Sequence, residues 1–152
     1  MTTAESRATR PTSSWRAVLL FVSTVYVALV LWITLRPLPW AIEGNQTAWG
    51  VLNPAAWTDA DAWVSGRPIE ILANVAMFLP AGILAGLLLR GPMRLIAPLA
   101  LTVMIEVGQI FLDDRISHPR DLVANALGAV IGLIVVGVGI RMAGTPAGAE
   151  QR

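Results

Sequence analysis

The sequence predicts an all-α membrane protein, a bundle of four transmembrane helices with the N and C termini in the cytoplasm. Hydrophobic residues make up 55% of the 152 residues and charged residues only 14%, a balance too apolar for a water-soluble domain of this size. The apolar residues also gather in runs close to the roughly 20 residues that a helix needs to cross a bilayer core. Composition and run length therefore predict the same fold class.

Four runs have this length: 17–35, 69–89, 95–112 and 122–140. The first run carries no charge and is preceded by arginines, as in a signal peptide, but it is long for one and no small-residue cleavage site follows. We interpret it as a retained anchor. Residues 1–16 and 142–152 are predicted cytoplasmic tails, 36–68 an outer loop, and 69–141 the core that holds the last three spans.

Arginine predicts the orientation, because cytoplasmic loops of membrane proteins are enriched in basic residues. A four-span path places seven arginines on the side of the termini and four on the other side, which also has six acids. The arginines on the predicted cytoplasmic side are Arg7, Arg10, Arg16, Arg90, Arg94, Arg141 and Arg152.

The predicted outer loop is rich in tryptophan and proline. Tryptophan prefers the headgroup zone, where its ring is buried and its N–H stays hydrated. Asn53 followed by Pro54 is typical of a helix start, so residues 55–64 are predicted to form a short helix on the outer surface.

Polar residues interrupt three of the spans near their predicted outer ends. Helical spacing of three or four puts each pair on one face of its helix, and Glu106 lies roughly 9 Å below the end of its run at 1.5 Å per residue. A carboxylate at that depth must face the bundle or water and find a partner. We expect the following residues to converge in a pocket near the outer interface: Glu70, Asn74, Glu106, Gln109, Arg115, Asp121 and Asn125.

Glycines are spaced so that two of the spans can pack closely. Gly82 and Gly86 are four apart in the second span, and Gly128 and Gly132 are four apart in the fourth. Small residues at this spacing allow helix backbones to approach each other in membranes. We interpret these four glycines as helix-packing residues.

Two interpretations of Glu106 stay open. It is either part of a functional pocket or a structural carboxylate, paired with Arg115 or Arg120, or protonated and hydrogen-bonded to Gln109 or Asn125. If it is paired, we expect Arg115 to be the partner. His118 is either a solvated loop histidine or a proton carrier.

Several classes of site are excluded or disfavoured by composition. The chain has no cysteine, so it has no disulfide, thiolate nucleophile or cysteine metal ligand. A single histidine cannot build a typical zinc site, and no Ser-His-Asp or HExxH pattern is present, so we expect no metal and no cofactor. The arginines are scattered, which gives no nucleic-acid face.

The pattern resembles the VanZ-like family of small bacterial membrane proteins. The matching residues are Asn74, "FLPAG" at 78–82, Glu106-x-x-Gln109, Arg115, Asp121, Asn125, Gly128 and Gly132. The segment "ISHPR" at 116–120 departs from the family pattern, because relatives often have a further acid there. The resemblance implies a location in the bacterial cell membrane and an association with resistance to teicoplanin, a glycopeptide that binds D-alanyl-D-alanine ends of wall precursors.

Three functions remain open. The first is a non-enzymatic envelope protein whose outer pocket binds a membrane lipid headgroup, a lipid-linked wall precursor or a lipoglycopeptide, with Arg115 and Arg120 available for phosphate or carboxylate. The second is a membrane-embedded hydrolase or transferase that uses Glu106 or Asp121 as general base and His118 as acid. The third is a small transporter, which would have to be a homo-oligomer because four spans without a repeat are too few.

Overall fold

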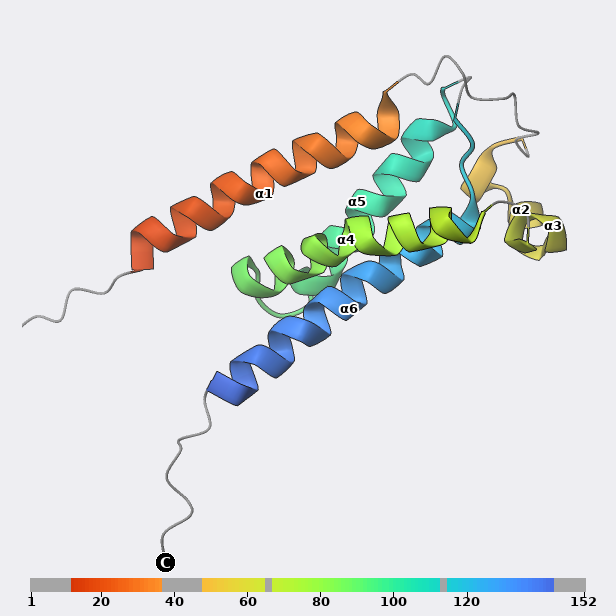
Figure 1. Ribbon diagram of the computed structural model, residues 1–152. Helices are drawn as coiled ribbons and strands as arrows, with labels where there is room; N and C mark the ends of the chain where they lie inside the picture. Colours follow the sequence, from red (N-terminus) through yellow and green to blue (C-terminus); the bar gives the residue numbers. More distant parts are fainter. Residues whose placement is uncertain (1–11, 37–47, 65–66, 113–114, 144–152) are drawn as a thin grey trace, which may run out of the picture.

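The computed structural model describes residues 12–36, 48–64, 67–112 and 115–143, and the regular elements in these ranges are all helices (Figure 1). The prediction of an all-α chain is therefore confirmed. Most of both predicted tails, together with Trp40, Asp113 and Asp114, lies outside the described residues.

Three helices are long and apolar enough to cross a membrane. They are α1 (Thr12–Leu35), α4 (Pro68–Leu88) and α6 (Pro119–Ala143), whose candidate spans are Ser14–Leu35, Pro68–Leu88 and Pro119–Met142. The chain is thus a multi-pass membrane protein, and the predicted spans at 17–35, 69–89 and 122–140 each fall on one of these helices, apart from Leu89, which follows the end of α4.

The fourth long helix, α5 (Met93–Gln109), is shorter than the run of 95–112 predicted. Its 17 residues span about 26 Å at 1.5 Å per residue, slightly less than the roughly 30 Å of a bilayer core. The helix ends at Gln109 because the backbone forms turns at Ile110 and Phe111. Sequence reasoning therefore placed the end of this helix three residues too late.

Helices α4 and α6 form the tightest contact in the bundle, and they lie side by side in Figure 1 with their first residues at the same end. A Cβ added at Gly82 would overlap the carbonyl oxygen of Ala129, and one added at Gly128 would overlap that of Val75. A Cβ at Gly132 would meet the Leu79 carbonyl oxygen in the same way. The two backbones are close only because these positions have no side chain.

Gly86 lies further along the same contact, where its neighbour is a side chain. A Cβ there would lie 3.2 Å from Cβ of Val136. The four glycines singled out from spacing therefore all lie at the α4–α6 contact, and the backbones approach most closely at Gly82, Gly128 and Gly132.

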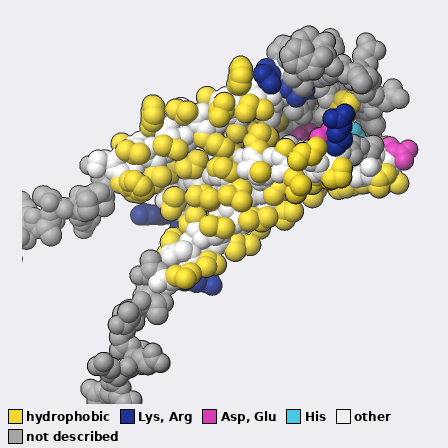
Figure 2. All heavy atoms as spheres, viewed as in Figure 1, with side chains coloured by type: hydrophobic (Ala, Val, Ile, Leu, Met, Phe, Trp, Pro, Cys, Tyr) yellow, Lys and Arg dark blue, Asp and Glu magenta, His cyan; other side chains and the backbone are white. Residues whose placement is uncertain are grey.

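Helix α1 packs on α4 and α5 through a small apolar core of Val30, Phe78, Ala81 and Ile105. The Tyr26 hydroxyl donates a hydrogen bond to the carbonyl of Met77, one turn before Pro80, whose missing N–H interrupts the backbone ladder of α4. Large apolar side chains on α1, such as Phe21 and Trp32, are exposed and suit contact with lipid. The space-filling view shows apolar side chains over most of the surface of the long helices (Figure 2).

Short helices lie at the end of the bundle where α4 and α6 begin: the 3-10 helix η1 (Gly50–Leu52), α2 (Pro54–Thr58) and α3 (Ala60–Val64). The Asn53 side chain accepts a hydrogen bond from the Ala55 N–H at 3.0 Å, so the predicted helix start is confirmed. The predicted single helix is divided, because Asp59 has an extended backbone between α2 and α3.

Candidate functional site

Glu106 is the most deeply buried charged side chain among the described residues, with 1% of its surface exposed. Its Oε2 atom accepts hydrogen bonds from the Ser117 hydroxyl at 3.2 Å and from the His118 backbone N–H at 3.1 Å. The carboxylate thereby joins the last part of α5 to the segment that enters α6. The expected pairing with Arg115 is wrong, since the carboxylate faces this inner segment and the arginine lies elsewhere.

Arg115 and Gln109 instead contact the C-terminal end of α1. The Arg115 guanidinium donates to the carbonyls of Ile33 at 2.8 Å and Arg36 at 2.9 Å, and the Gln109 amide donates to the carbonyl of Thr34 at 3.1 Å. The last carbonyls of a helix lack intrahelical partners and carry a partial negative charge, so they attract a guanidinium. These two predicted site residues therefore hold α1 to the bundle, and neither binds Glu106.

Arg120 links the starts of α4 and α6. Its Nη2 lies 3.3 Å from Oε2 of Glu70, and its Nε lies 3.4 Å from Oδ1 of Asp121. The arginine side chain is 9% exposed, whereas that of Glu70 is 49% exposed. Because one acid of this ion pair is half in solvent, the pair with Glu70 contributes less than a fully buried one.

Asn125 lies one turn deeper in α6 and is 2% exposed. Its Nδ2 donates to the Thr102 hydroxyl at 2.9 Å, which ties α6 to α5. Its Oδ1 is buried and has no hydrogen-bond partner among the described residues, and the same holds for Nδ1 of His118. Buried polar atoms nearly always have partners, so these two atoms are where hydrogen-bonding capacity is left over in this network.

Ser117 is positioned by the segment around η1. The Val51 N–H donates to the Ser117 hydroxyl oxygen at 3.4 Å, and that hydroxyl in turn donates to Glu106. Gly50 has a φ of 47°, and a Cβ on it would lie 2.6 Å from Cβ of Ser117. Only glycine fits this contact, so residues 48–52 close over the segment that Glu106 binds.

We call the group of Glu70, Glu106, Ser117, His118, Arg120, Asp121 and Asn125 the polar cluster. Asp121 lies within electrostatic range of Glu106, Glu70, His118 and Arg120. Two carboxylates, Glu70 and Asp121, thus contact the one guanidinium, and Glu106 adds a third carboxyl group near Asp121. The cluster therefore favours hydrogen-bond donors and positive charge. Among the described residues no group of three potential metal ligands is close enough to hold an ion.

Asn74 is a third predicted site residue, after Gln109 and Arg115, that lies outside the polar cluster. It lies in α4 one turn after Glu70, is partly exposed, and makes no hydrogen bond with the residues that the structure describes. Its position on the face of Glu70 agrees with the helical spacing, but spacing does not predict a contact.

Three residues of this region were not among those predicted to converge. They are Thr102, Ser117 and Arg120. Thr102 is detectable in principle, because it precedes Glu106 by four residues and so shares its face on α5. No local pattern marks Ser117, whose role depends on Gly50, 67 residues earlier.

A family model described as VanZ/LLP1 matches residues 23–139. The matched range contains α4 and α5 entirely, the second half of α1, most of α6, and every residue of the polar cluster. No significant match to a curated protein or to a solved structure was found.

Proposed function

Because the chain belongs to the VanZ/LLP1 family, we propose that it is a non-enzymatic protein of the bacterial cell membrane whose polar cluster binds a headgroup from the outer leaflet. The ligand is the polar part of a membrane lipid, of a lipid-linked wall precursor or of a lipid-anchored glycopeptide of the teicoplanin type. All three carry an apolar anchor, which would place the polar part at the depth of the cluster.

The proposal includes a four-span topology in which α5 also crosses. Helices α4 and α6 start at the same end of the bundle and run in the same direction (Figure 1), so α5 has to return the chain to that end. The 17 residues of α5 cover most of a bilayer core. Arg16, Arg90, Arg94 and Arg141 then lie on one side, which the arginine bias assigns to the cytoplasm.

The observation that carries the binding proposal is the pair of buried atoms without partners, Nδ1 of His118 and Oδ1 of Asn125. They lie in a region with three carboxyl groups, so it offers acceptors and negative charge. A hydroxyl, amide N–H or ammonium group of a ligand would supply the missing donor. Sugar and peptide parts of wall precursors and glycopeptides carry many such groups.

These acceptor atoms favour a ligand that donates hydrogen bonds. From the sequence alone, Arg115 and Arg120 had instead suggested a ligand with a phosphate or carboxylate. Arg120 already points its donors at two carboxylates, and Arg115 at the carbonyls of α1. A phosphate would have to displace these contacts and approach Glu70 and Asp121. The structure therefore supports recognition through donors of the ligand rather than through its phosphate.

A second candidate function rests on His118 and Asp121. An unpartnered imidazole nitrogen within electrostatic range of a carboxylate is the arrangement that a general acid and a general base require in a hydrolase or transferase. Against this, Glu106, the other candidate base, already accepts two hydrogen bonds that fix the chain. Binding without catalysis thus agrees better with the contacts.

The topology is testable with reporters. A domain that fluoresces only in the cytoplasm, fused after Arg141, is expected to be fluorescent, and the same domain inserted between α2 and α3 is expected to be dark. Fluorescence of the second fusion alone would reverse the orientation and place the polar cluster at the inner face.

The binding proposal predicts separate effects on function and on abundance. Glu106→Gln and Asp121→Asn each replace a carboxyl group with an amide of similar shape and keep an oxygen acceptor, so both proteins should reach the membrane at normal abundance. We expect each to lose the envelope phenotype that the wild type confers, measured as sensitivity to a lipidated glycopeptide. Full activity of both variants at normal abundance would exclude a ligand role for these acids.

A further inference from the structure

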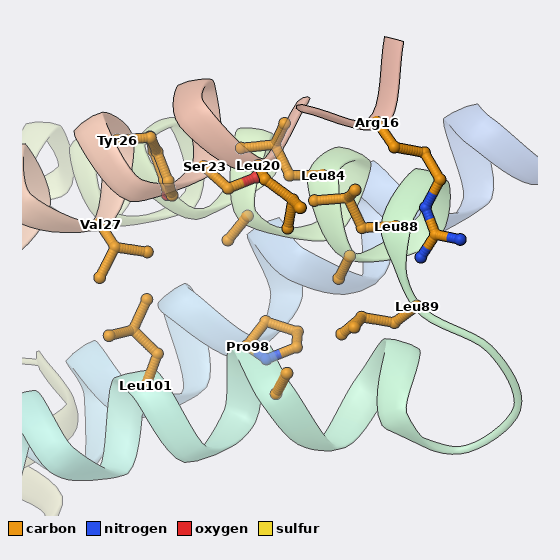
Figure 3. Close-up of a pocket in the computed structure, with 13 residues that line it drawn as sticks. Arg16, Leu20, Ser23, Tyr26, Val27, Leu84, Leu88, Leu89, Pro98 and Leu101 are labelled. Carbon is orange, nitrogen blue, oxygen red and sulfur yellow. The ribbon is translucent and has the colours of Figure 1, made fainter. Parts of the chain in front are cut away.

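A second feature of the bundle lies at the end opposite the polar cluster and has no part in the proposed function. It is a cavity of about 350 Å³ between the first half of α1, the second half of α4 with Leu89, and the first half of α5. Figure 3 shows Leu20 and Leu84 on one side of it and Pro98 and Leu101 on the other.

The interior of this cavity is effectively apolar. Two of its lining side chains, Ser23 and Tyr26, carry hydroxyl groups, and both donate them to backbone carbonyls, Ser23 to Leu19 at 2.8 Å and Tyr26 to Met77. Apart from Arg16 at the mouth, the lining side chains therefore leave no donor for a polar solute, and an alkyl chain is the group that fits such a lining.

The shape of the cavity follows the helices. Its lining on α1 runs from Arg16 to Val27, a length of about 16 Å at 1.5 Å per residue. Because α1 is a membrane span, the long direction of the cavity is that of the acyl chains around it.

Basic side chains lie at the mouth of this cavity, near Leu88 and Leu89, and they favour an anionic headgroup there. Arg16 is exposed, makes no ion pair with another described residue, and points its guanidinium toward Leu88 and Leu89 (Figure 3). Arg94 lies beside this mouth, since its Nε donates to the Leu89 carbonyl at 3.0 Å.

The acids that the structure describes lie away from this mouth. The acidic side chains visible in Figure 2 lie at the other end of the bundle, and the described acids belong to α2–α3, the segment between them, the polar cluster or the start of α4. Among the described residues, an anionic headgroup at the mouth would thus meet basic side chains and no carboxylate.

We propose that this cavity binds one acyl chain of an anionic phospholipid, with the phosphate of that lipid held by Arg16. The lipid would fill the space that α1 leaves when it packs on α4 and α5, and would hold the first half of α1 to the core. The site is independent of the polar cluster, so failure of either proposal leaves the other standing.

The test is native mass spectrometry of the full chain in detergent with added phosphatidylglycerol or phosphatidylcholine of the same chain length. We expect the wild type to bind phosphatidylglycerol preferentially, and Arg16→Gln to lose about fivefold in affinity for it, which corresponds to about 1 kcal/mol for one basic side chain near an anionic lipid. Arg67→Gln, at the opposite end, removes the same charge and should change nothing.

A second variant tests the cavity itself. Ala97 lines it and is exposed, so Ala97→Trp should fill the space without disturbing the core, and should reduce binding of both lipids. Equal binding of the two lipids by the wild type, or identical losses in Arg16→Gln and Arg67→Gln, would overturn the proposal. So would undiminished binding by a folded Ala97→Trp protein.

Discussion

Replacing Gly128 with alanine is expected to destabilise the bundle by about 3 kcal/mol or more, although alanine is the better helix former. The new methyl group would overlap the carbonyl of Val75, and backbone atoms cannot rotate away as a side chain can. Helices α4 and α6 would have to separate along their closest contact. The expected loss therefore lies at the upper end of the usual cost of overpacking. Thermal unfolding in detergent, together with membrane abundance, measures the loss.

Gly137→Ala is the matched control. Gly137 lies on the same helix, but a Cβ there meets no atom within 4 Å, so the substitution should be neutral or slightly stabilising from helix propensity alone. If Gly128→Ala melts at the temperature of Gly137→Ala, the close approach of α4 and α6 is not a feature of the folded protein.

We expect Glu106→Leu and Glu106→Gln to differ strongly in their free energy of unfolding. Glu106→Leu would leave the Ser117 hydroxyl and the His118 N–H without their acceptor, at a cost of about 2–6 kcal/mol, since each unsatisfied group costs about 1–3 kcal/mol. Glu106→Gln keeps an oxygen for both donors and should stay within about 1 kcal/mol of the wild type. Both are measured as unfolding midpoints in detergent.

The comparison between these variants also separates charge from hydrogen bonding. If Glu106→Gln is as damaging as Glu106→Leu, the charge itself holds the chain together. If Glu106→Leu is as stable as the wild type, the contacts with Ser117 and His118 contribute nothing to folding. Glu106 would then not stabilise the junction between α5 and the segment that enters α6.

Much of the architecture was predictable because the bilayer imposes simple rules. Long uncharged runs have to be helices, and glycines four residues apart on two of them predicted close packing at the positions where α4 meets α6. The end of α5 was harder to predict, since residues 110–112 are as apolar as the helix but form turns. Hydropathy measures transfer into lipid and says little about where a helix ends.

The sequence predicted which residues lie on inward helix faces better than it predicted which side chains contact each other. Spacing placed Glu106, Asp121 and Asn125 on inward faces, but it could not decide between Arg115 and Arg120 as the arginine of the cluster. That choice depends on the end of α1, whose free carbonyls take Arg115, and on the adjacency of α4 and α6, which brings Arg120 to Glu70. Both are long-range contacts, and neither has a local signal in the sequence.

The most direct test of the central claim, that the polar cluster binds a ligand, is to identify what leaves the membrane with the protein. Wild type and Glu106→Gln are purified in parallel in mild detergent, and the bound lipids and wall precursors are identified by native mass spectrometry. We expect a species that carries hydroxyl or ammonium donors and is depleted about tenfold in Glu106→Gln, the size of effect when a ligand donor meets an amide instead of a carboxyl group. The same species at the same occupancy in two equally stable proteins would contradict it, and would leave the cluster with a structural role alone.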